Sequence, residues 1–288
     1  MTVAALKQNV ILDQKVGLED FFVLLSFVTG RSKAFLLAHE EYSLNQEQTT
    51  LLESLLKRRA LHEPTSYLIG TREFFGRDFL VTPAVLIPRP ETELLIEQVL
   101  SQMETNTAPT TLIDIGTGSG AIILTLSLEL ALRGHHYDYL GIDISPEALR
   151  VATENKKKLQ DTAVTFLQSD LLVAIPETSW TDTVIILANL PYVSAIQYRE
   201  AMPDVVLYEP ALALISGADG LDHYRRLITE LRAKKKPSSL TLYLEIDALQ
   251  TIPIRKLLEE SFPDGVCEVW KDLAGHERLI RYTLQKTF

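Results

Sequence analysis

The sequence predicts an α/β protein, in which a mostly parallel sheet carries helices on both faces, preceded by a small helical bundle domain. Three observations predict this fold. A glycine-rich loop at residues 116–120 joins a β-rich apolar run to a helical stretch, strand-like and helix-like segments then alternate, and residues 1–78 show only helical periodicity. Two successive strand-like segments close the chain, so we expect an antiparallel pair at the edge and a seven-stranded mixed sheet.

Composition narrows the class of protein. The chain has 288 residues and a formal net charge of −10, from 28 basic and 38 acidic residues. That balance disfavours a phosphate-rich partner, because nucleic-acid binding rests on Lys and Arg. The single cysteine, Cys267, excludes an internal disulfide and fits a reducing compartment. No signal segment, apolar run of roughly 20 residues or metal site is visible, so we expect a cytoplasmic protein without membrane or metal.

The first 78 residues are expected to form a helical domain that binds the substrate. Apolar residues follow helical spacing from Leu18 to Val28 and stop at Gly30. Ser43 and Gln46 predict a capping box that opens another helix. Residues 79–90 alternate apolar positions with prolines and predict a β-hairpin linker. Residues 91–288 are then the catalytic domain.

The remaining elements follow from alternating patterns. Ser145 and Pro146 have the residue types of an N-cap and a first helical position. Strands are expected at residues 112–115, 139–144, 164–167, 183–188, 240–246, 266–270 and 279–284, and helices at residues 121–132 and 221–231 and after residue 246.

The glycine loop predicts a site for a nucleotide-like cofactor. Glycines allow the backbone to approach a ligand closely, and the following helix offers free N–H groups to an anionic part of it. The same pattern also occurs as a structural turn of doubly wound domains. The residues expected at this site are Asp114, Gly116, Thr117, Gly118, Ser119 and Gly120.

Two acids follow at the ends of later strands. Asp143 ends the second strand, where its carboxylate is placed to accept hydrogen bonds from both ribose hydroxyls of an adenosine. Asp170 ends the third strand and can accept from the adenine amine, while Leu171 packs on the ring. Asp170 fits an N-cap of the next short helix equally well.

The loop residues are compatible with two cofactors. Gly116, Gly118 and Ala121 satisfy the loose pattern of dinucleotide-binding loops, so an NAD-binding module stays open. Asp114 and the third glycine, Gly120, complete D-x-G-x-G-x-G, which resembles the first motif of class I S-adenosylmethionine-dependent methyltransferases. That Rossmann-like superfamily implies S-adenosylmethionine as cofactor and S-adenosylhomocysteine as product.

The substrate signal is Asn189-Leu190-Pro191-Tyr192, at the end of the fourth strand. It resembles the (N/D/S)-(P/L)-P-(Y/F) motif of methyltransferases that act on planar nitrogen. Such a nitrogen is a poor nucleophile, because its lone pair is delocalised. If Asn189 Oδ1 and the Leu190 carbonyl each accept one N–H, the lone pair points at the methyl group. Pro191 stiffens the turn, and the Tyr192 ring covers the planar group.

Further stretches resemble the release-factor glutamine methyltransferases (PrmC/HemK type). They cover nearly the whole chain: Tyr67-Leu68-Ile69-Gly70 with Glu73-Phe74-Phe75-Gly76, Leu86 to Glu93, Glu209-Pro210, Gly217 to Leu221, and Asp272 to Arg278. The resemblance implies protein methylation at the side-chain amide nitrogen of the Gly-Gly-Gln glutamine in peptide-chain release factors, which modulates translation termination. The partner is then the release factor, with no direct nucleic-acid binding.

The resemblance also assigns site residues, with two departures. It implies cofactor contacts at residues 116–120, Asp143, Asp170-Leu171 and Asn189, and substrate contacts at residues 189–192. Leu190 stands where the family usually has proline, and Leu171 where relatives often carry an aromatic residue. Arg89 and Glu93 are placed near the cleft or in an inter-domain ion pair.

A second function stays open beside amide methylation. N-L-P-(Y/F) also occurs in rRNA adenine dimethyltransferases, so the alternative is an adenine-N6 methyltransferase acting on RNA or DNA. The net charge of −10 and the matches along the whole chain favour the amide.

Overall fold

The computed structural model describes residues 1–13, 15–176, 180–234 and 237–285. Its contacts divide the chain into two compact units. One unit, called here the helical unit, comprises Met1–Thr71 and Met202–Tyr208. The other, the sheet unit, comprises Arg72–Ala201 and the chain from Glu209 onward.

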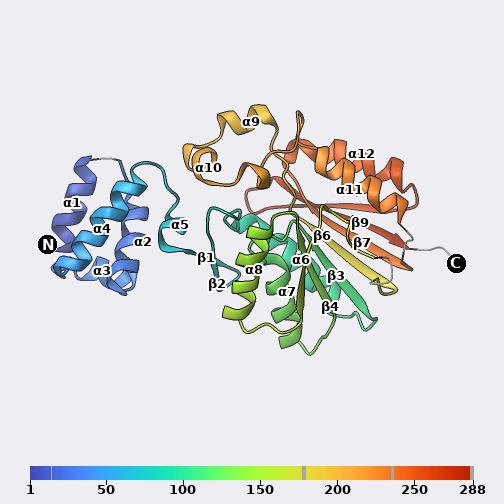
Figure 1. Ribbon diagram of the computed structural model, residues 1–288, viewed down its shortest axis with the longest axis horizontal. Coiled ribbons are helices and arrows are strands. Elements are labelled where there is room, and N and C mark those ends of the chain that lie inside the picture. The colour runs from blue at the N-terminus through green and yellow to red at the C-terminus, as the bar shows by residue number, and fades with distance from the viewer. Residues whose placement is uncertain (14, 177–179, 235–236, 286–288) are drawn as a thin grey trace. The chain divides into compact units, whose positions relative to one another are not determined.

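The helical unit is a bundle of short helices around an apolar core (Figure 1). Phe21, Leu25 and Leu52 are fully buried in that core. Gly30 ends the second helix in a left-handed conformation, as its position after the last periodic residue predicts. The helices are α1 (Val3–Asp13), α2 (Leu18–Thr29), α3 (Lys33–Ala38), α4 (Gln46–Arg59), α5 (Thr65–Ile69) and α10 (Pro203–Tyr208).

The capping box of α4 lies two residues later than the sequence suggests. Asn45, not Ser43, is the N-cap, and its side chain accepts from the Gln48 backbone while Gln48 accepts from the Asn45 backbone. Both pairs have the required three-residue spacing. The prediction was wrong because Leu44 is buried in the core of the helical unit, so the helix starts after it.

A segment distant in sequence completes the helical unit. Arg59 on α4 pairs with Asp20 at 2.7 Å and with Asp204 on α10 at 3.5 Å. The Tyr208 hydroxyl of α10 donates to the Leu61 carbonyl at 2.9 Å. The chain therefore leaves the sheet unit after residue 201, packs on the helical unit and returns at residue 209.

The hairpin lies earlier than residues 79–90. Its strands are β1 (Thr71–Phe74) and β2 (Arg77–Leu80), joined by Phe75 and Gly76. Both joining residues have positive φ, 50° and 71°, which suits a two-residue hairpin turn. Residues 81–90 contain three prolines and form no strand, because proline lacks the N–H that pairing requires.

The sheet unit contains a seven-stranded mixed sheet in the order β5-β4-β3-β6-β7-β9-β8. All neighbouring pairs from β5 to β7 are parallel, and β9 is antiparallel to both β7 and β8. This confirms the predicted seven-stranded sheet and its closing antiparallel pair. The strands are β3 (Thr110–Ile115), β4 (Asp138–Asp143), β5 (Val164–Gln168), β6 (Thr183–Ala188), β7 (Ser239–Glu245), β8 (Val266–Lys271) and β9 (Glu277–Gln285).

Helices cover both faces of this sheet (Figure 1). Alternate residues of one strand enter opposite cores: Val184 and Ile186 pack with α11 and α12, whereas Ile185 and Leu187 pack with α6 and α7. The helices of the sheet unit are α6 (Glu93–Met103), α7 (Ala121–Leu132), α8 (Pro146–Lys158), α9 (Ala195–Glu200), α11 (Asp222–Ala233) and α12 (Thr251–Ser261).

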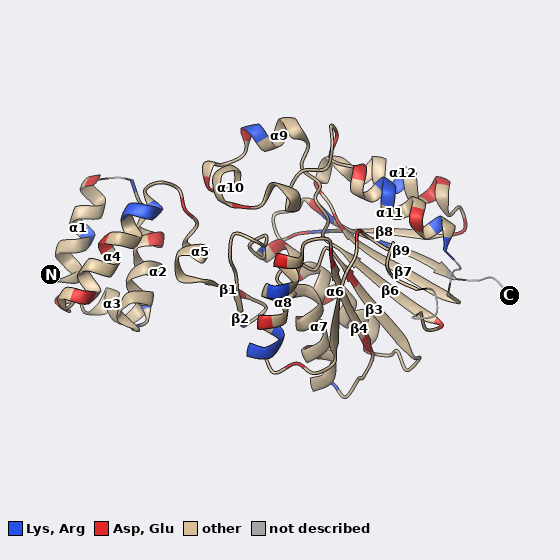
Figure 2. Cartoon of the chain, viewed as in Figure 1, with Lys and Arg blue, Asp and Glu red and all other residues tan. Residues whose placement is uncertain are grey.

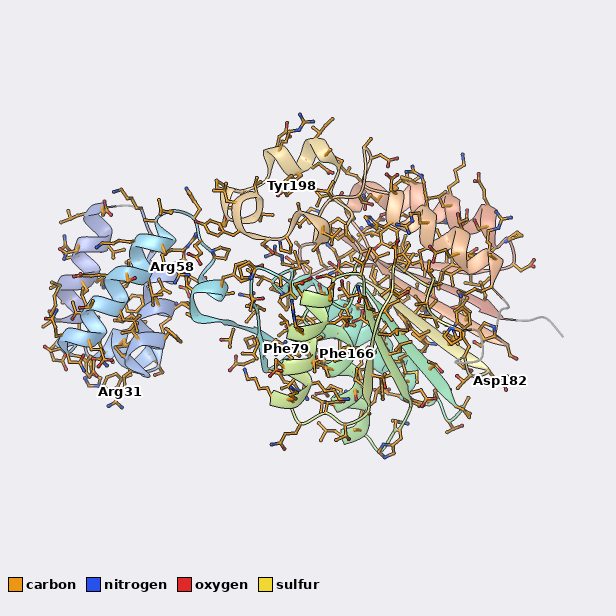
Figure 3. All side chains as sticks on the ribbon, viewed as in Figure 1. Arg31, Arg58, Phe79, Phe166, Asp182 and Tyr198 are labelled. Atoms are coloured by element: carbon orange, nitrogen blue, oxygen red, sulfur yellow. The ribbon has the colours of Figure 1, made fainter. Side chains whose placement is uncertain are left out.

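Helix α8 begins as its sequence predicts and ends in a basic turn. Ser145 is the N-cap, Pro146 is the first helical residue, and three lysines occupy the last turn (Figure 2). Beside this helix, Phe79 of the hairpin is fully buried and Phe166 of β5 packs against the same core (Figure 3). No helix in the described part of the chain is both long and apolar enough to cross a bilayer.

Candidate active site

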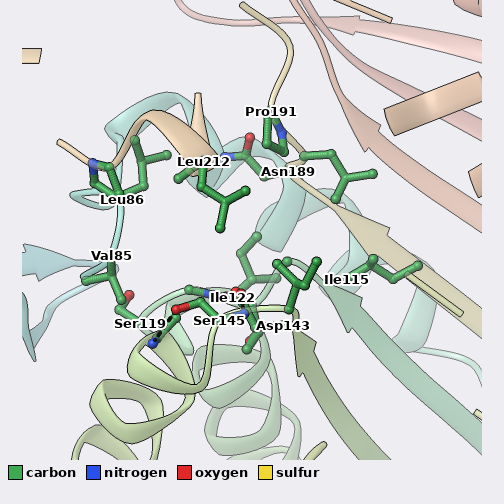
Figure 4. A pocket seen from close by; sticks show the side chains of 18 of the residues that line it. Val85, Leu86, Ile115, Ser119, Ile122, Asp143, Ser145, Asn189, Pro191 and Leu212 are labelled. Carbon is green, nitrogen blue, oxygen red and sulfur yellow. Dashed lines mark hydrogen bonds between the residues drawn. The ribbon is translucent and has the colours of Figure 1, made fainter. Parts of the chain in front are cut away.

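A cavity of about 420 Å³ opens at the carboxyl ends of β3, β4 and β6. Parallel doubly wound sheets bind their ligands at this edge. In Figure 4, Asn189 and Pro191 lie on one side of the cavity, and Asp143, Ser119 and Ser145 lie on the other. The cavity is therefore lined both by the glycine loop and by residues 189–191 of the turn after β6.

The glycine loop follows β3 and lines the cavity with Gly116, Thr117, Gly118 and Ser119. Gly116 and Thr117 donate their N–H groups to the Ile142 carbonyl of β4, at 2.9 and 2.8 Å. Gly118 has a φ of 54°, and a Cβ placed there would meet only the Gly116 carbonyl, at 4.0 Å. A side chain at residue 118 would thus extend into open cavity space.

Asp114 and Gly120 support the loop without lining the cavity. The Asp114 side chain is fully buried, and its Oδ2 accepts from the Thr117 hydroxyl at 2.6 Å. Burial raises the pKa of Asp114 to about 7, and the hydrogen bond from Thr117 opposes that rise. Gly120 caps α7 in a left-handed conformation with a φ of 80°.

Asp143 ties the loop to the next helix. Its Oδ2 accepts from the Gly118 backbone N–H and its Oδ1 from the Ser145 backbone N–H, both at 2.9 Å. Burial raises the pKa of this carboxyl, while the backbone hydrogen bonds lower it. Because a carboxylate oxygen has two lone pairs, both oxygens keep acceptor capacity toward the cavity.

Asp170 and Leu171, which follow β5, also line the cavity. Asp170 Oδ2 pairs with Arg226 of α11 at 2.7 Å. Leu171 is buried, and its backbone has a φ of 49°. Non-glycine residues rarely adopt this conformation, and such positions cluster at ligand sites. The Ser169 hydroxyl holds it by donating to the Leu171 carbonyl at 2.8 Å.

The turn after β6 brings Asn189, Leu190 and Pro191 to the cavity. Asn189 Nδ2 donates to the Thr92 hydroxyl at 3.2 Å. Within the described ranges, no donor reaches Asn189 Oδ1 or the Leu190 carbonyl. The Leu190 side chain is buried, and a Cβ at Gly116 would come within 3.2 Å of its Cδ2. One side-chain acceptor and one backbone acceptor, on two residues that line the cavity, are therefore without a donor among the described residues.

Tyr192 anchors this turn from outside the cavity wall. The side-chain amide of Gln250 donates to the Tyr192 carbonyl at 2.8 Å and to the Gly220 carbonyl at 3.2 Å. Gly220 is tightly constrained, since a Cβ there would lie 2.2 Å from the Tyr192 carbonyl oxygen. The Tyr192 ring packs against the core shared with α11 and α12, and burial raises its pKa.

Arg89 and Glu93 have separate partners. Arg89 lines the cavity and pairs with buried Glu209 at 2.5 Å, while the second oxygen of Glu209 accepts from the Ile87 N–H at 3.2 Å. Glu93 accepts from the Phe75 N–H at 2.9 Å and so holds the hairpin turn. Both residues thus position the segment before α6.

Other cavity residues were not anticipated from the sequence. Thr92, His223 and Arg226 line the cavity, although they come from distant parts of the chain. His223 Nδ1 lies 2.8 Å from the Ser216 hydroxyl, and burial lowers its pKa. The apolar walls are formed by Val85, Leu86, Ile115, Ile122 and Leu212. His223 and Arg226 carried no signal in the sequence, unlike the glycine loop, the strand-end acids and residues 189–192.

Comparison with known proteins decides the family. Residues 17–70 match the PrmC N-terminal domain family, and residues 106–208 match a methyltransferase domain family. The release factor glutamine methyltransferase of Bacillus anthracis is 36% identical over 260 residues, which cover 90% of this chain and 89% of that protein. The chain belongs to the release factor glutamine methyltransferase family.

Further comparisons agree with this membership. The release factor glutamine methyltransferase of Streptococcus pneumoniae is 36% identical over 262 residues, 89% of either chain. The N-terminal domain of human METTL16 in complex with SAH is 17% identical, with a TM-score of 0.51 over 90% of this chain and 93% of that chain. That likeness shows the methyltransferase fold.

The cavity fits S-adenosylmethionine, the cofactor of the methyltransferase domain in this family. Its volume of about 420 Å³ lies in the range of small-molecule sites. Because residue 118 is a glycine, the space beside it is open, whereas any side chain there would fill it. The Asp143 carboxylate lies next to this space and offers hydrogen-bond acceptors. Apolar walls and a few convergent polar groups complete a typical cofactor site.

Proposed function

We propose that this chain transfers a methyl group from S-adenosylmethionine to the side-chain amide nitrogen, N5, of the glutamine in the Gly-Gly-Gln motif of peptide-chain release factors. The observation that carries the proposal is the pair of free acceptors, Asn189 Oδ1 and the Leu190 carbonyl, at the cavity edge. A primary amide has two N–H groups, so one amide nitrogen satisfies both acceptors at once.

The glycine loop and the strand-end acids would hold the cofactor. Gly116 to Gly118 give close backbone approach, and Asp143 accepts from the ribose hydroxyls. Asp170, held by Arg226, accepts from the adenine amine with its second oxygen, while Leu171 covers the ring. When bound, S-adenosylmethionine supplies an electrophilic methyl group, whose former bonding electrons stay on the sulfur.

Asn189 and Leu190 act on the other reactant. By accepting both N–H groups they fix the plane of the amide and direct the nitrogen lone pair toward the methyl group. The amide is then oriented before the reaction begins, so that the entropy cost of orienting it is not part of the activation barrier. The acceptors also stabilise the positive charge that develops on the nitrogen as the new N–C bond forms. The amide proton is lost to water after bond formation, so no strong general base is required.

Two stretches of the chain would divide the work. We assign residues 1–78 to binding of the release factor and residues 91–288 to catalysis, a division supported by the match of residues 17–70 to the PrmC N-terminal domain family. The adenine-N6 alternative is not favoured, because the relatives that match about nine-tenths of the chain are named for release-factor glutamine methylation.

The test offers substrates in parallel. The protein is incubated with tritium-labelled S-adenosylmethionine and either a release factor, RNA or DNA. We expect label in the release factor and none in nucleic acid. Label in RNA or DNA, with none in the release factor, would show that the adenine-N6 activity is the correct one.

A further inference from the structure

Glu245 is a buried carboxyl that the mechanism above leaves without a role. It ends β7, and its side chain is 2% exposed. Strands β6 and β7 pair in parallel up to Ala188 and Leu244, so Asn189 and Glu245 occupy the next positions on neighbouring strands. Among the described residues, no hydrogen-bond donor reaches Glu245 Oε2. A buried carboxylate oxygen without a hydrogen-bond partner destabilises the folded state, so we looked for a role of this carboxyl in the site.

Thr92 lies between Glu245 and Asn189. Thr92 is 4% exposed, and its hydroxyl accepts from Asn189 Nδ2 at 3.2 Å. The same hydroxyl hydrogen-bonds the Glu245 carboxylate and so lowers the pKa of that carboxyl. In the described chain, the Thr92 hydroxyl has no other acceptor for its proton. A hydroxyl carries one proton, so its direction decides what the oxygen can accept.

We propose that Glu245 is a positioning residue that sets the orientation of the Asn189 amide through Thr92. The ionised carboxylate accepts a hydrogen bond from the Thr92 hydroxyl, so that toward Asn189 the Thr92 oxygen can only accept. It then accepts from Asn189 Nδ2, and Asn189 Oδ1 must turn toward the substrate. The proposal rests on the proposed function, since it concerns the acceptor that would hold the substrate amide.

The charge of Glu245 is sensitive to its surroundings. Burial raises the pKa of Glu245 to about 7, Thr92 and Arg278 lower it, Glu91 raises it and Arg89 lowers it. Tyr192 and Tyr224 also face this carboxyl, and burial raises the pKa of both, so they stay neutral. Once protonated, Glu245 can donate to Thr92, whose own proton can then turn to Asn189 Oδ1. Below about pH 7, the amide therefore loses its fixed orientation.

The kinetic test compares Thr92→Val, Thr92→Ser and Glu245→Gln. Valine keeps the shape of threonine without its hydroxyl, and serine keeps the hydroxyl, so Thr92→Ser is the matched control. We expect Thr92→Val and Glu245→Gln to lower kcat about 10- to 100-fold. The KM for S-adenosylmethionine stays unchanged, and Thr92→Ser stays close to wild type. The wild-type kcat rises with pH around a midpoint of about 7, and that step is absent in Glu245→Gln.

A second readout needs no activity. The side-chain amide resonances of Asn189 are identified by their loss in Asn189→Asp and followed by NMR across neutral pH, with no cofactor added. They should shift with a midpoint of about 7 in the wild type and stay constant in Thr92→Val and Glu245→Gln. Wild-type kcat in Thr92→Val, or an Asn189 resonance indifferent to pH, would overturn the relay. A wild-type protein that shows the resonance shift but does not methylate a release factor would overturn only the proposed function.

Discussion

At the scale of single residues, we expect Asn189 to act in the proposed transfer through one atom, its Oδ1. Asn189→Ala removes the side-chain acceptor for the substrate amide and leaves the glycine loop intact. We expect kcat to fall by about 100- to 1000-fold, the loss typical of one transition-state hydrogen-bonding group. Calorimetric titration should show S-adenosylmethionine binding close to wild type. Wild-type kcat in this variant would contradict the assigned role.

A substitution at Leu190 distinguishes the proposed role of its backbone carbonyl from the packing of its side chain. Leu190→Ala keeps the carbonyl that accepts from the substrate but removes a side chain that is 3% exposed. We expect kcat close to wild type, with a loss of about 2–5 kcal/mol in the free energy of unfolding from the cavity left behind. Urea unfolding and steady-state kinetics on the same sample separate the two effects. A large fall in kcat with unchanged stability would assign the side chain a catalytic part instead.

Asp114 predicts a pH dependence of stability. Its pKa is about 7 in the folded protein and about 3.9 when unfolded, so folding favours the protonated form. Its stability contribution is full below the unfolded pKa and is lost as pH rises through about 7. The loss amounts to at most about 4 kcal/mol. Asp114→Asn keeps an acceptor for Thr117 but does not ionise. Its free energy of unfolding should fall less than that of the wild type between about pH 5 and about pH 8.

At the scale of elements, the periodicity of apolar residues predicts the bounds of individual helices and strands. The strand β6 and the helix α7 have the bounds expected from sequence, because their apolar runs are flanked by turn residues. The hairpin was placed too late, since its turn uses Phe75 with positive φ, a conformation that a phenylalanine rarely adopts and that its residue type does not predict. The capping box of α4 was misplaced because Ser43 and Asn45, on either side of Leu44, are each followed three residues later by a glutamine.

The site residues, too, could be predicted only in part from the sequence. Asp143, Asp170 and Asn189 stand at strand ends and could be predicted, because a polar residue there interrupts an apolar run. Thr92 and Arg226 reach the cavity from helices whose orientation depends on packing. The residues around Thr92 and those around Asn189 do not predict that the two side chains form a hydrogen bond, because they are 97 positions apart in sequence.

Two glycines with positive φ offer a matched pair at the element scale. A methyl group at Gly118 would enter the cavity, whereas one at Gly220 would lie 2.2 Å from the Tyr192 carbonyl oxygen. Each alanine variant bears about 1–2 kcal/mol of backbone strain. We expect Gly118→Ala to weaken S-adenosylmethionine binding with only that stability loss, and Gly220→Ala to lose more stability because the turn must move. Thermal unfolding with and without cofactor measures both. Equal destabilisation with unchanged binding would contradict the assignment of the cavity.

At the scale of the whole molecule, the two units have separate cores. Because the cavity residues all belong to the sheet unit, S-adenosylmethionine should protect that unit by mass action, by about 3 kcal/mol at 100 times its Kd. Hydrogen exchange should slow in β3, β4 and β6 and stay unchanged in α1, α2 and α4. Adding a release factor should slow exchange in those three helices. Cofactor protection confined to the helical unit would show that the cavity is not the cofactor site.

The net charge of −10 bears on the partner at this scale. Nucleic-acid binding releases counterions and weakens steeply with salt, which requires a basic surface. In this protein the runs of lysine are short, and the one that ends α8 lies where it stabilises the helix terminus. A protein substrate is therefore the better match to the charge.

The central claim is methyl transfer to one glutamine amide, and locating the methyl group tests it most directly. Wild-type protein is incubated with S-adenosylmethionine and a release factor, alongside a release factor in which the Gly-Gly-Gln glutamine is replaced by glutamate. Peptides are then sequenced by mass spectrometry. We predict one added methyl group on that glutamine and none on the glutamate variant. A methyl group elsewhere in the release factor, or equal transfer to both proteins, would contradict the claim.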